Sequence, residues 1–575
     1  MSRYIDRFIP FQWLEGYTSR RLGRDTIAGL TTAVMLIPQA MAYAMLAGLP
    51  PIIGLYASIV PLAVYAALGS SRDLAVGPVA MVSLLVATGV GAVAEAGTQE
   101  YVAMAVLLSL MVGVMQFVMG VAKLGFLANF LSHPVISGFT SAAALIIGFS
   151  QLKHLMGVSL PRTHRVHEVL WQALLRAGET NLITLGMGVG AVAALVVLKS
   201  VRPMWPRALV VVALGTLATW GLGLAELGVK IVGEVPAGLP SPALPVWDVD
   251  ALERMLPIAA TIALVGFMES ISVAKAVATK KGYEINADKE LVGLGLANVA
   301  GAMFQAYPVT GGFSRTAVNA NAGATSPMAS LVTAAVIAIS LLFFTPLFYF
   351  LPQTVLAAII MTAVFGLIDT HEVAHLWKVK RSDLALLGLT FFATLGLGIE
   401  QGILLGVGTS MLWFVVRTTR PHTAILGRVP VEDDYTNAYR NVLNYPQAET
   451  YPGVMIVRMD AQFYFGNVAF LRDTLRAWEA EQSEPLHTLI LDCSAMNELD
   501  SSADTALHEL YAAYTSRGVN LMLAHVKGPV RRVMQRSGLL DKLGPDANHL
   551  TVHHAVVDAL RVVREVEDGD TSTAA

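Results

Sequence analysis

The sequence predicts an α-helical membrane protein of about fourteen transmembrane segments that ends in a small soluble α/β domain. Of its 575 residues, 55% are hydrophobic and only 14% are charged, with a mean hydropathy of +0.59. Ordinary soluble domains carry about 25% charged residues. Apolar stretches long enough to cross a bilayer follow one another up to residue 420, and strand-like and helix-like segments then alternate. The first region therefore lies in lipid and the second does not.

The composition also excludes several classes of protein. The net charge of −3 argues against nucleic acid as a partner. The one cysteine, Cys493, permits neither an intrachain disulfide nor a cysteine metal cluster. No HExxH motif or metal-ligand spacing of histidines occurs, so we expect no metal site and no cofactor apart from a coupling ion. The first residues lack the apolar core of a signal peptide. Residues 4–14 are aromatic and mixed, as in an interfacial segment on the lipid surface or a soluble cap.

The apolar runs indicate two halves of seven spans each. The third and tenth are short or interrupted, and broken segments at corresponding places in two halves point to the site of an inverted-repeat transporter. The expected spans are 26–47, 51–69, 76–94, 101–122, 134–152, 181–199, 206–224, 256–279, 289–306, 314–325, 328–350, 353–370, 383–399 and 401–417.

Loop charge predicts the orientation of these spans. Basic residues such as Arg24, Lys199 and Lys378 gather on one side, and acidic residues such as Glu226 lie on the other. This charge asymmetry is a bias and not absolute, because the basic residue Arg176 lies on the same side as the acidic residues. Under the positive-inside rule both termini are cytoplasmic, and we expect a multi-pass protein of the cell's inner (plasma) membrane.

The segment after residue 420 has the pattern of a small sheet covered by helices. We expect strands at 454–459, 488–493 and 519–524, and helices at 468–481, 502–517, 529–537 and 553–566. The expected domain limits are an N-terminal segment 1–25, a transport domain 26–420, a linker 421–440, the soluble domain 441–567 and a disordered tail 568–575.

The polar break at 307–316 is the first candidate site. Pro308 and Gly312 end one helix, and Ser314 is a natural cap for the next. A helix beginning there would point free N–H groups into the membrane interior, with Arg315 adding a full charge. This predicts an anion site. The alternative is a simple cap, with Arg315 paired to a carboxylate elsewhere.

A similar break at 75–80 lies in the other half. Pro78 suits the first turn of a helix, since its missing N–H would be unpaired there anyway. Backbone N–H groups at Val79 and Ala80 would then face the same anion. The alternative is a simple proline kink.

Several motifs resemble the SulP anion transporters, and the end of the chain is similar to their STAS domain. The resemblance covers almost the whole chain and implies seven-plus-seven inverted repeats, a core of spans 1–4 and 8–11, a gate of spans 5–7 and 12–14, and a homodimer. It rests on Asp-Thr-Ile-Ala-Gly-Leu at 25–30, Ile-Pro-Gln-Ala-Met-Ala-Tyr-Ala at 37–44, Pro-Pro-Ile-Ile-Gly-Leu-Tyr at 50–56, Val-Gly-Pro-Val-Ala at 76–80, His-Pro-Val-Ile-Ser-Gly-Phe at 133–139, the break at 308–316, Leu-Asp-Cys-Ser-Ala at 491–495 and Leu-Asp-Ser-Ser-Ala at 499–503.

Gln39 and Tyr43 lie four residues apart and so share one face of the first span. The resemblance places both in the lining of the anion pocket. The alternative is that Gln39 makes its hydrogen bonds to another helix and that Tyr43 packs as part of the hydrophobic core.

Glu269 lies inside the eighth span, where a carboxylate is costly and is a functional candidate by default. It could carry a proton, or hold a sodium ion together with Ser272. It could also be a structural partner of Lys275 or Arg315. The resemblance implies a coupling-ion carboxylate in this region for bacterial members of the family.

Ser502 is similar to the phosphorylatable serine of stand-alone STAS proteins, although a helix cap explains it as well. A regulatory partner could bind this domain.

The sequence therefore predicts a secondary active transporter of a small inorganic anion, with sulfate first. Transport would be coupled to protons or sodium, with elevator-type alternating access. Alternatives are a bicarbonate, chloride or C4-dicarboxylate transporter, an anion exchanger, an anion channel, and a membrane-anchored STAS regulator.

Overall fold

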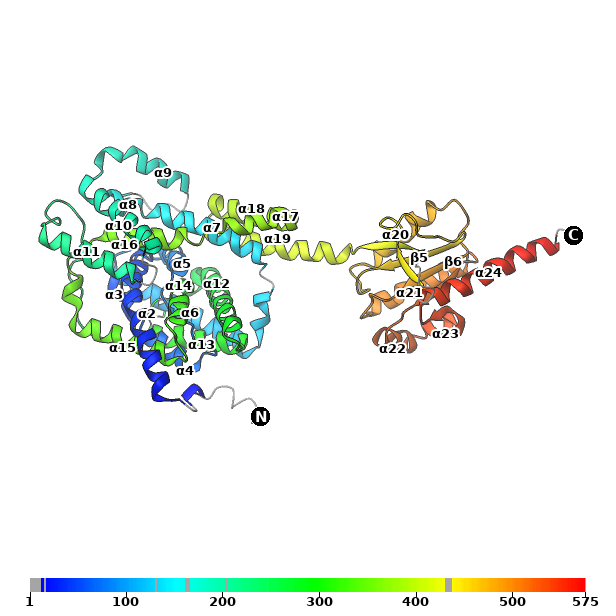
Figure 1. The fold of residues 1–575 in the computed structure, drawn as a ribbon, viewed down its shortest axis with the longest axis horizontal. Coiled ribbons are helices and arrows are strands. Elements are labelled where there is room, and N and C mark those ends of the chain that lie inside the picture. Colours follow the sequence, from blue (N-terminus) through cyan, green and yellow to red (C-terminus); the bar gives the residue numbers. More distant parts are fainter. Residues whose placement is uncertain are drawn as a thin grey trace. The chain divides into compact units, whose positions relative to one another are not determined.

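A computed structural model describes residues 12–14, 17–129, 132–160, 166–201, 205–245, 247–429 and 437–573 (Figure 1). Most of the segment expected at the membrane interface, 4–14, lies outside the described residues. The chain divides into two compact units, Met1–Ser410 and Met411–Ala575, so the division falls within helix α19 (Ile399–Thr419). The finer domain limits expected from the sequence stay predictions.

The first unit is helical, and each of the fourteen expected spans contains a helix. Within the described residues, eight segments are long and apolar enough to cross a membrane, and α5, α11 and α15 are shorter apolar helices. The helices are α2 (Ser19–Leu46), α3 (Pro51–Tyr56), α4 (Val60–Leu68), α5 (Ala80–Gly91), α6 (Gln99–Val121), α7 (His133–Ser150), α8 (Leu152–Met156), α9 (Val166–Leu175), α10 (Leu182–Val201), α11 (Arg207–Gly221), α12 (Val249–Lys281), α13 (Ala287–Ala302), α14 (Phe313–Asn321), α15 (Met328–Phe343), α16 (Gln353–Phe365), α17 (Thr370–Val379), α18 (Arg381–Leu397) and α19.

Helices α2 and α12 each begin about two turns earlier than hydropathy indicates, because polar caps precede the apolar runs. Thr18 caps α2, its hydroxyl accepting from the backbone N–H of Arg21. Asp248 caps α12 by accepting from the backbone N–H of Ala251 at 3.1 Å. Such side chains satisfy N–H groups that lack a partner within the helix.

Helix packing separates a core from a gate, as the resemblance implies. In the core, α13 packs on α6 and α4, α15 on α2, and α12 on α6 and α5. In the gate, α18 packs on α7, and α16 packs on α7 and α10. The contact of α6 with α13 is backbone to backbone: a Cβ on Gly295 would lie 2.5 Å from the backbone nitrogen of Phe117. Small residues permit this close approach in membranes.

The second unit is a six-stranded sheet in the order β4-β3-β5-β6-β7-β8, with β5 to β8 parallel. One apolar layer packs against α20 to α23 and the other against α24. The strands are β3 (Thr423–Val429), β4 (Ala438–Asn441), β5 (Val454–Met459), β6 (Thr488–Asp492), β7 (Asn520–Ala524) and β8 (Asn548–His549); the helices are α20 (Val468–Ala480), α21 (Ser501–Thr515), α22 (Gly528–Arg536), α23 (Leu539–Leu543) and α24 (Val552–Thr573).

The three expected strands and four expected helices are present with ends shifted by a few residues. Sequence analysis missed β3, β4 and β8. Strand β3 falls in the stretch assigned to a linker at 421–440, so this part of the linker belongs to the sheet. Helix α24 continues to Thr573, past the expected start of a disordered tail at 568.

Candidate anion site

The two breaks meet in space. They form short antiparallel strands, β1 (Val76–Gly77) and β2 (Thr310–Gly311), with Val76 opposite Gly311 and Gly77 opposite Thr310. Helices α5 and α14 begin a few residues after these strands. Two helix N-termini, each with N–H groups that have no intrahelical partner, therefore begin close to the same point.

Buried polar side chains hold the second break in place. Asn298 of α13 is fully buried; it accepts from the backbone N–H of Val309 at 2.8 Å and donates to the carbonyl of Val309 at 3.1 Å. Its amide also donates to Gln116 at 3.0 Å. The hydroxyl of Ser270 accepts from the backbone N–H of Gly311 at 2.8 Å. Irregular backbone at membrane depth needs such partners.

Sequence analysis missed these supporting residues. The signal for Asn298, Gln116 and Ser270 was present, since each is a polar residue inside an apolar span. What the sequence lacks is any indication that all three lie near one stretch of backbone that is distant in sequence.

Arg315 joins the two breaks. Its side chain is 1% exposed, and Nη1 donates to the carbonyl oxygen of Pro78 in the opposite break. A Cβ on Gly312 would lie 2.7 Å from Nη2, so a larger residue there would displace the guanidinium. Within the described residues Nε and Nη2 are buried and have no hydrogen-bond partner. A buried cation with two unpaired donors is suited to bind an anion.

The expected role of Ser314 as a helix cap is wrong. Helix α14 begins at Phe313 with Gly312 as its N-cap and no side-chain cap bond, and Ser314 is an exposed residue of the first turn. Pro78 also differs from the expectation. It precedes Val79, the N-cap of α5, so it lies outside the first turn of that helix. Its carbonyl holds Arg315 instead.

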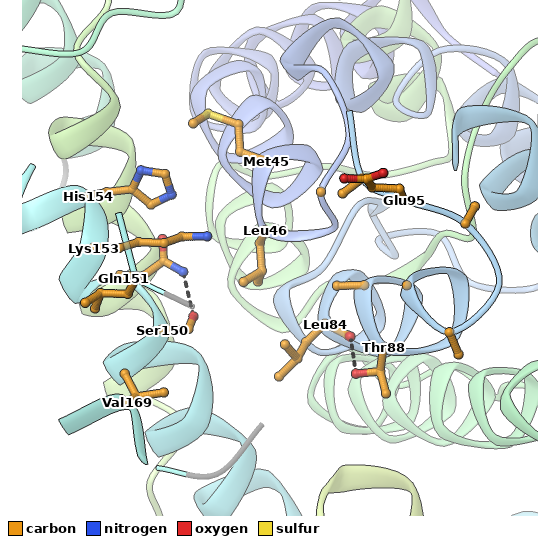
Figure 2. Close-up of a pocket in the computed structure, with 17 residues that line it drawn as sticks. Met45, Leu46, Leu84, Thr88, Glu95, Ser150, Gln151, Lys153, His154 and Val169 are labelled. Atoms are coloured by element: carbon orange, nitrogen blue, oxygen red, sulfur yellow. Dashed lines mark hydrogen bonds between the residues drawn. The ribbon is translucent and has the colours of Figure 1, made fainter. Parts of the chain in front are cut away.

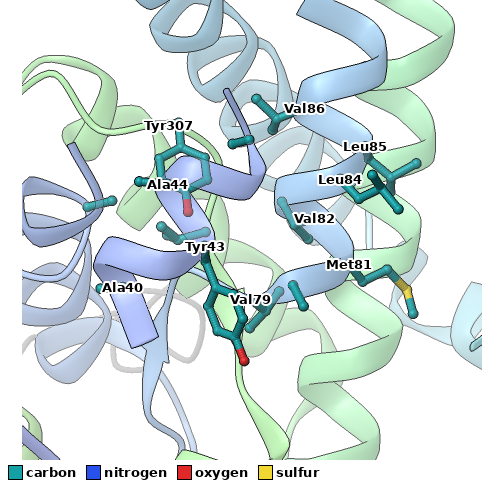
Figure 3. Close-up of a cluster of buried hydrophobic side chains, with 14 of the residues drawn as sticks. Ala40, Tyr43, Ala44, Val79, Met81, Val82, Leu84, Leu85, Val86 and Tyr307 are labelled. Atoms are coloured by element: carbon teal, nitrogen blue, oxygen red, sulfur yellow. The ribbon is translucent and has the colours of Figure 1, made fainter. Parts of the chain in front are cut away.

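Gln39 and Tyr43 lie in the C-terminal part of α2 and are 4% and 6% exposed. Figure 3 shows Tyr43 on α2 near Val79, at the start of α5. Tyr307, which directly precedes Pro308 of the second break, is also buried. The side-chain oxygen of Gln39 is buried and has no hydrogen-bond partner within the described residues, so the alternative in which another helix satisfies it is not supported. Tyr43 and Tyr307 belong to the same buried cluster as Val79 and Val309 of the two breaks.

Glu269 lines a cavity of about 260 Å³ that reaches the first turns of both half-helices. Its walls include Met81 of α5 and Phe313 of α14 on the core side, and Ile403 of α19 on the gate side. Ser272 lines the same cavity. It is therefore on the same wall as Glu269 and could share a bound cation with it.

The environment of Glu269 differs from that of a structural ion-pair partner. Within the described residues it forms no ion pair with Lys275 or Arg315, and its Oε2 is buried without a hydrogen-bond partner. No group of three or more His, Cys, Asp or Glu side chains that could hold a metal ion occurs in the described part of the chain.

A larger cavity of about 770 Å³ lies at the other end of α5 (Figure 2). The end of α2 and the loop with Glu95 form one wall, and α8 with Lys153 and His154 forms the other. The two cavities thus contact opposite ends of the same half-helix, and both lie between core and gate helices.

In the soluble unit, the expected cap role of Ser502 is also wrong. Asp500 is the N-cap of α21, its carboxylate accepting from the backbone N–H of Ala503 at 2.8 Å. Ser502 is exposed in the first turn. Its possible phosphorylation stays a prediction.

The fold and the site together define a membrane transporter with two intertwined repeats and a soluble α/β domain. Residues 22–390 match the model of the sulfate permease family, and residues 445–558 match that of the STAS domain. The chain therefore belongs to the sulfate permease family, whose members are transporters and not enzymes.

Relatives and solved structures agree with this assignment. The chain is 40% identical to sulfate transporter 4.1, chloroplastic, of Arabidopsis thaliana over 98% of this chain and 84% of the relative. It is 34% identical to high affinity sulfate transporter 2 of Stylosanthes hamata over 96% of this chain and 86% of the relative. The murine Slc26a9 anion transporter in the inward-facing state matches with a TM-score of 0.90 and 26% identity over 98% of this chain and 95% of that structure. The transmembrane domain of the cyanobacterial bicarbonate transporter BicA matches with a TM-score of 0.60 and 26% identity over 69% of this chain and 98% of that structure.

Proposed function

We propose that the protein is a secondary active transporter of sulfate, coupled to an inward flux of protons or sodium ions. The observation that carries this proposal is Arg315, a buried guanidinium with two unpaired nitrogens where two half-helices begin. A divalent oxyanion would accept hydrogen bonds from those nitrogens and from the first N–H groups of α5 and α14. Similarity to named sulfate transporters supports sulfate as the substrate.

The coupling ion binds at Glu269 and Ser272 in this proposal. An unpaired charge in so apolar a cavity is unfavourable, and a bound cation relieves that cost. The cation also adds positive charge beside the anion site. Anion and cation binding then favour each other, and thermodynamic linkage makes the effect reciprocal.

The two cavities at opposite ends of α5 support alternating access as part of the proposal. The half-helix belongs to the core, while α7, α8 and α19 contribute walls from the gate. A rigid movement of core against gate would close one cavity and open the other, as in an elevator mechanism.

The proposal includes a homodimer in the plasma membrane with both termini cytoplasmic. One relative is named as chloroplastic, so localisation needs its own test by tagging the chain.

Bicarbonate or chloride is the second candidate substrate. Helix N-termini and one arginine attract any small anion, and BicA is a bicarbonate transporter with a similar transmembrane domain. A C4-dicarboxylate, exchange in place of symport, and a channel are further outcomes that the same experiment distinguishes.

Uptake by the purified protein in proteoliposomes tests the proposal. Radiolabelled sulfate, bicarbonate, chloride and succinate are offered with and without inward proton or sodium gradients. We expect saturable sulfate uptake that one of the gradients accelerates. Uptake of another anion alone, or flux that does not saturate, would contradict the proposal. A chain ending at residue 420, before β3, should still bind sulfate, which a STAS regulator that does not transport would not do.

A further inference from the structure

Helix α17 exposes an apolar face within the gate. It joins α16 to α18 and packs on α18 (Figure 1). Leu376 is its one buried residue. Val373 and Trp377 lie four residues apart, so they share one side of the helix, and they are 41% and 64% exposed. Ala374, three residues before Trp377, is exposed beside them. No described part of the chain therefore covers this side of α17.

The remaining exposed surface of α17 is mostly polar. It carries His371, His375 and Lys378. Charged side chains at this density are too costly for the hydrocarbon core of a bilayer. A helix with one apolar side and one basic side lies instead in the plane of the membrane surface, and tryptophan is enriched at that depth. The sequence of α17 therefore fits an interfacial helix and not a membrane-spanning one.

Positive charge flanks Trp377. Lys378 follows it directly, and the guanidinium carbon of Arg381, the first residue of α18, lies 5.8 Å from the centre of its ring. Both basic residues are exposed. Loop charge places this stretch on the cytoplasmic side of the membrane. Two cations thus accompany the apolar face at the membrane surface where anionic lipids gather.

The nearby carboxylates are engaged elsewhere. Asp369 caps α17 by accepting from the backbone N–H of Glu372 at 2.9 Å. The carboxylate of Glu372 lies 3.1 Å from Nδ1 of His133 at the start of α7, which attaches this side of α17 to the gate. The carboxylate of Asp383 lies 3.9 Å from Nζ of Lys380. The exposed side of α17 therefore keeps a net positive charge.

We propose that α17 lies in the cytoplasmic surface of the bilayer and binds the headgroups of anionic phospholipids through Lys378 and Arg381. Val373 and Trp377 enter the boundary between headgroups and acyl chains, and the two cations contact the lipid phosphates. Charge complementarity selects anionic over zwitterionic lipids. The adjoining gate helices also expose apolar side chains, such as Phe392 of α18, which a bilayer covers.

Such binding has a consequence for transport. The headgroups would hold the gate at a fixed depth, because α17 is attached to α7 and continues into α18. The core would then move against a gate that the membrane surface anchors. This consequence rests on the proposed transport function, whereas the lipid contact itself does not and can be measured without any substrate.

Quenching by brominated lipids tests the contact in the purified full chain. Ala374→Cys places a thiol on the apolar face, and a bimane label attaches there, because the native Cys493 is buried. The labelled protein is reconstituted in phosphatidylcholine with rising fractions of brominated phosphatidylglycerol or brominated phosphatidylcholine. Each basic residue near an anionic surface changes binding about fivefold. We expect phosphatidylglycerol to bind beside the label about 25-fold more strongly than phosphatidylcholine.

Matched variants show which charges select the lipid. Lys378→Ala or Arg381→Ala alone should lower the preference about fivefold, and the double variant should quench equally with both lipids. Both residues are exposed, so the fold should persist. Lys280→Ala removes the same charge from an exposed position of the core helix α12 and should keep the wild-type preference.

Three results would overturn the proposal. Equal quenching by the two lipids in the parent protein would mean that α17 does not select anionic headgroups. A full preference in the double variant would mean that other residues select them. No quenching by either lipid would mean that water or a protein partner covers this face.

Discussion

The two breaks have matching backbones but different side chains. Each consists of a two-residue strand followed by a short helix, and the strands pair with each other. The break before α5 offers an anion only its backbone. The break before α14 contributes Arg315, and Asn298 and Ser270 hold its backbone. The repeat thus supplies a symmetric cradle, and one half alone supplies the full charge.

This asymmetry predicts that the loss of Arg315 has the largest effect. Hydrogen bonds to charged groups contribute about 1.5–3 kcal/mol, so Arg315→Ala should lower kcat/KM for sulfate by about 10- to 100-fold. Arg315→Lys should be intermediate, since it keeps the charge but loses the forked donors. Initial uptake rates in proteoliposomes measure both. Arg254→Ala, at an exposed position of α12, is the control. Normal uptake by Arg315→Ala would mean that the backbone dipoles of the two half-helices are sufficient to bind the anion.

The second prediction separates coupling from anion binding. Glu269→Gln keeps the size of the side chain but fixes it as neutral, so sulfate exchange should persist while acceleration by an ion gradient is lost. In the wild type the coupling cation should change sulfate affinity by about 5- to 150-fold, the usual range for coupling between two sites, and this dependence should be lost in the variant. Glu253→Gln, at an exposed position of the same helix, should accumulate sulfate normally. Accumulation by Glu269→Gln with wild-type dependence on pH and sodium would make Glu269 structural.

The third prediction concerns the space that Gly312 leaves. In Gly312→Ala the new methyl group would lie 2.7 Å from Nη2 of Arg315, so the guanidinium must move. We expect a loss in kcat/KM of about tenfold or less, which is smaller than for Arg315→Ala. Gly186→Ala adds the same methyl group where no atom lies within 4 Å and serves as control. Equal uptake by the two variants would show that the guanidinium position is unimportant.

The smallest effect is expected in the soluble unit. Asp500 caps α21, so Asp500→Ala should cost about 1 kcal/mol of local stability. Amide exchange across 501–515 should become about fivefold faster, and sulfate uptake should not change. Ser502→Ala should alter neither amide exchange nor sulfate uptake, because Ser502 does not cap the helix. Faster exchange in Ser502→Ala alone would reverse this assignment.

Much of the membrane fold follows from patterns within single segments. The lengths of the apolar stretches predicted fourteen spans. Glycine and proline residues predicted the positions of both breaks. The predicted starts of α2 and α12 were less accurate, because their polar caps, Thr18 and Asp248, precede the apolar stretches that hydropathy detects. Strands β4 and β8 are only four and two residues long, which is too short for a clear alternation.

The candidate site was only half predictable for the same reason. Arg315, Gln39 and Glu269 could be found because each is a polar residue in an apolar span. The contact of Arg315 with Pro78 could not be found from the sequence, because it joins residues 237 positions apart. Ser314 is not the cap, because Gly312, which has no side chain to cap with, is the N-cap of α14.

The central claim is that the anion lies at the meeting of the two half-helices and binds Arg315. A crystal structure with bound selenate, a heavier tetrahedral oxyanion, tests it directly through the anomalous signal of selenium. We predict one strong peak within hydrogen-bond distance of Nε or Nη2 of Arg315 and of the first N–H groups of α5 and α14. A selenate bound in the membrane unit away from Arg315 would contradict the account.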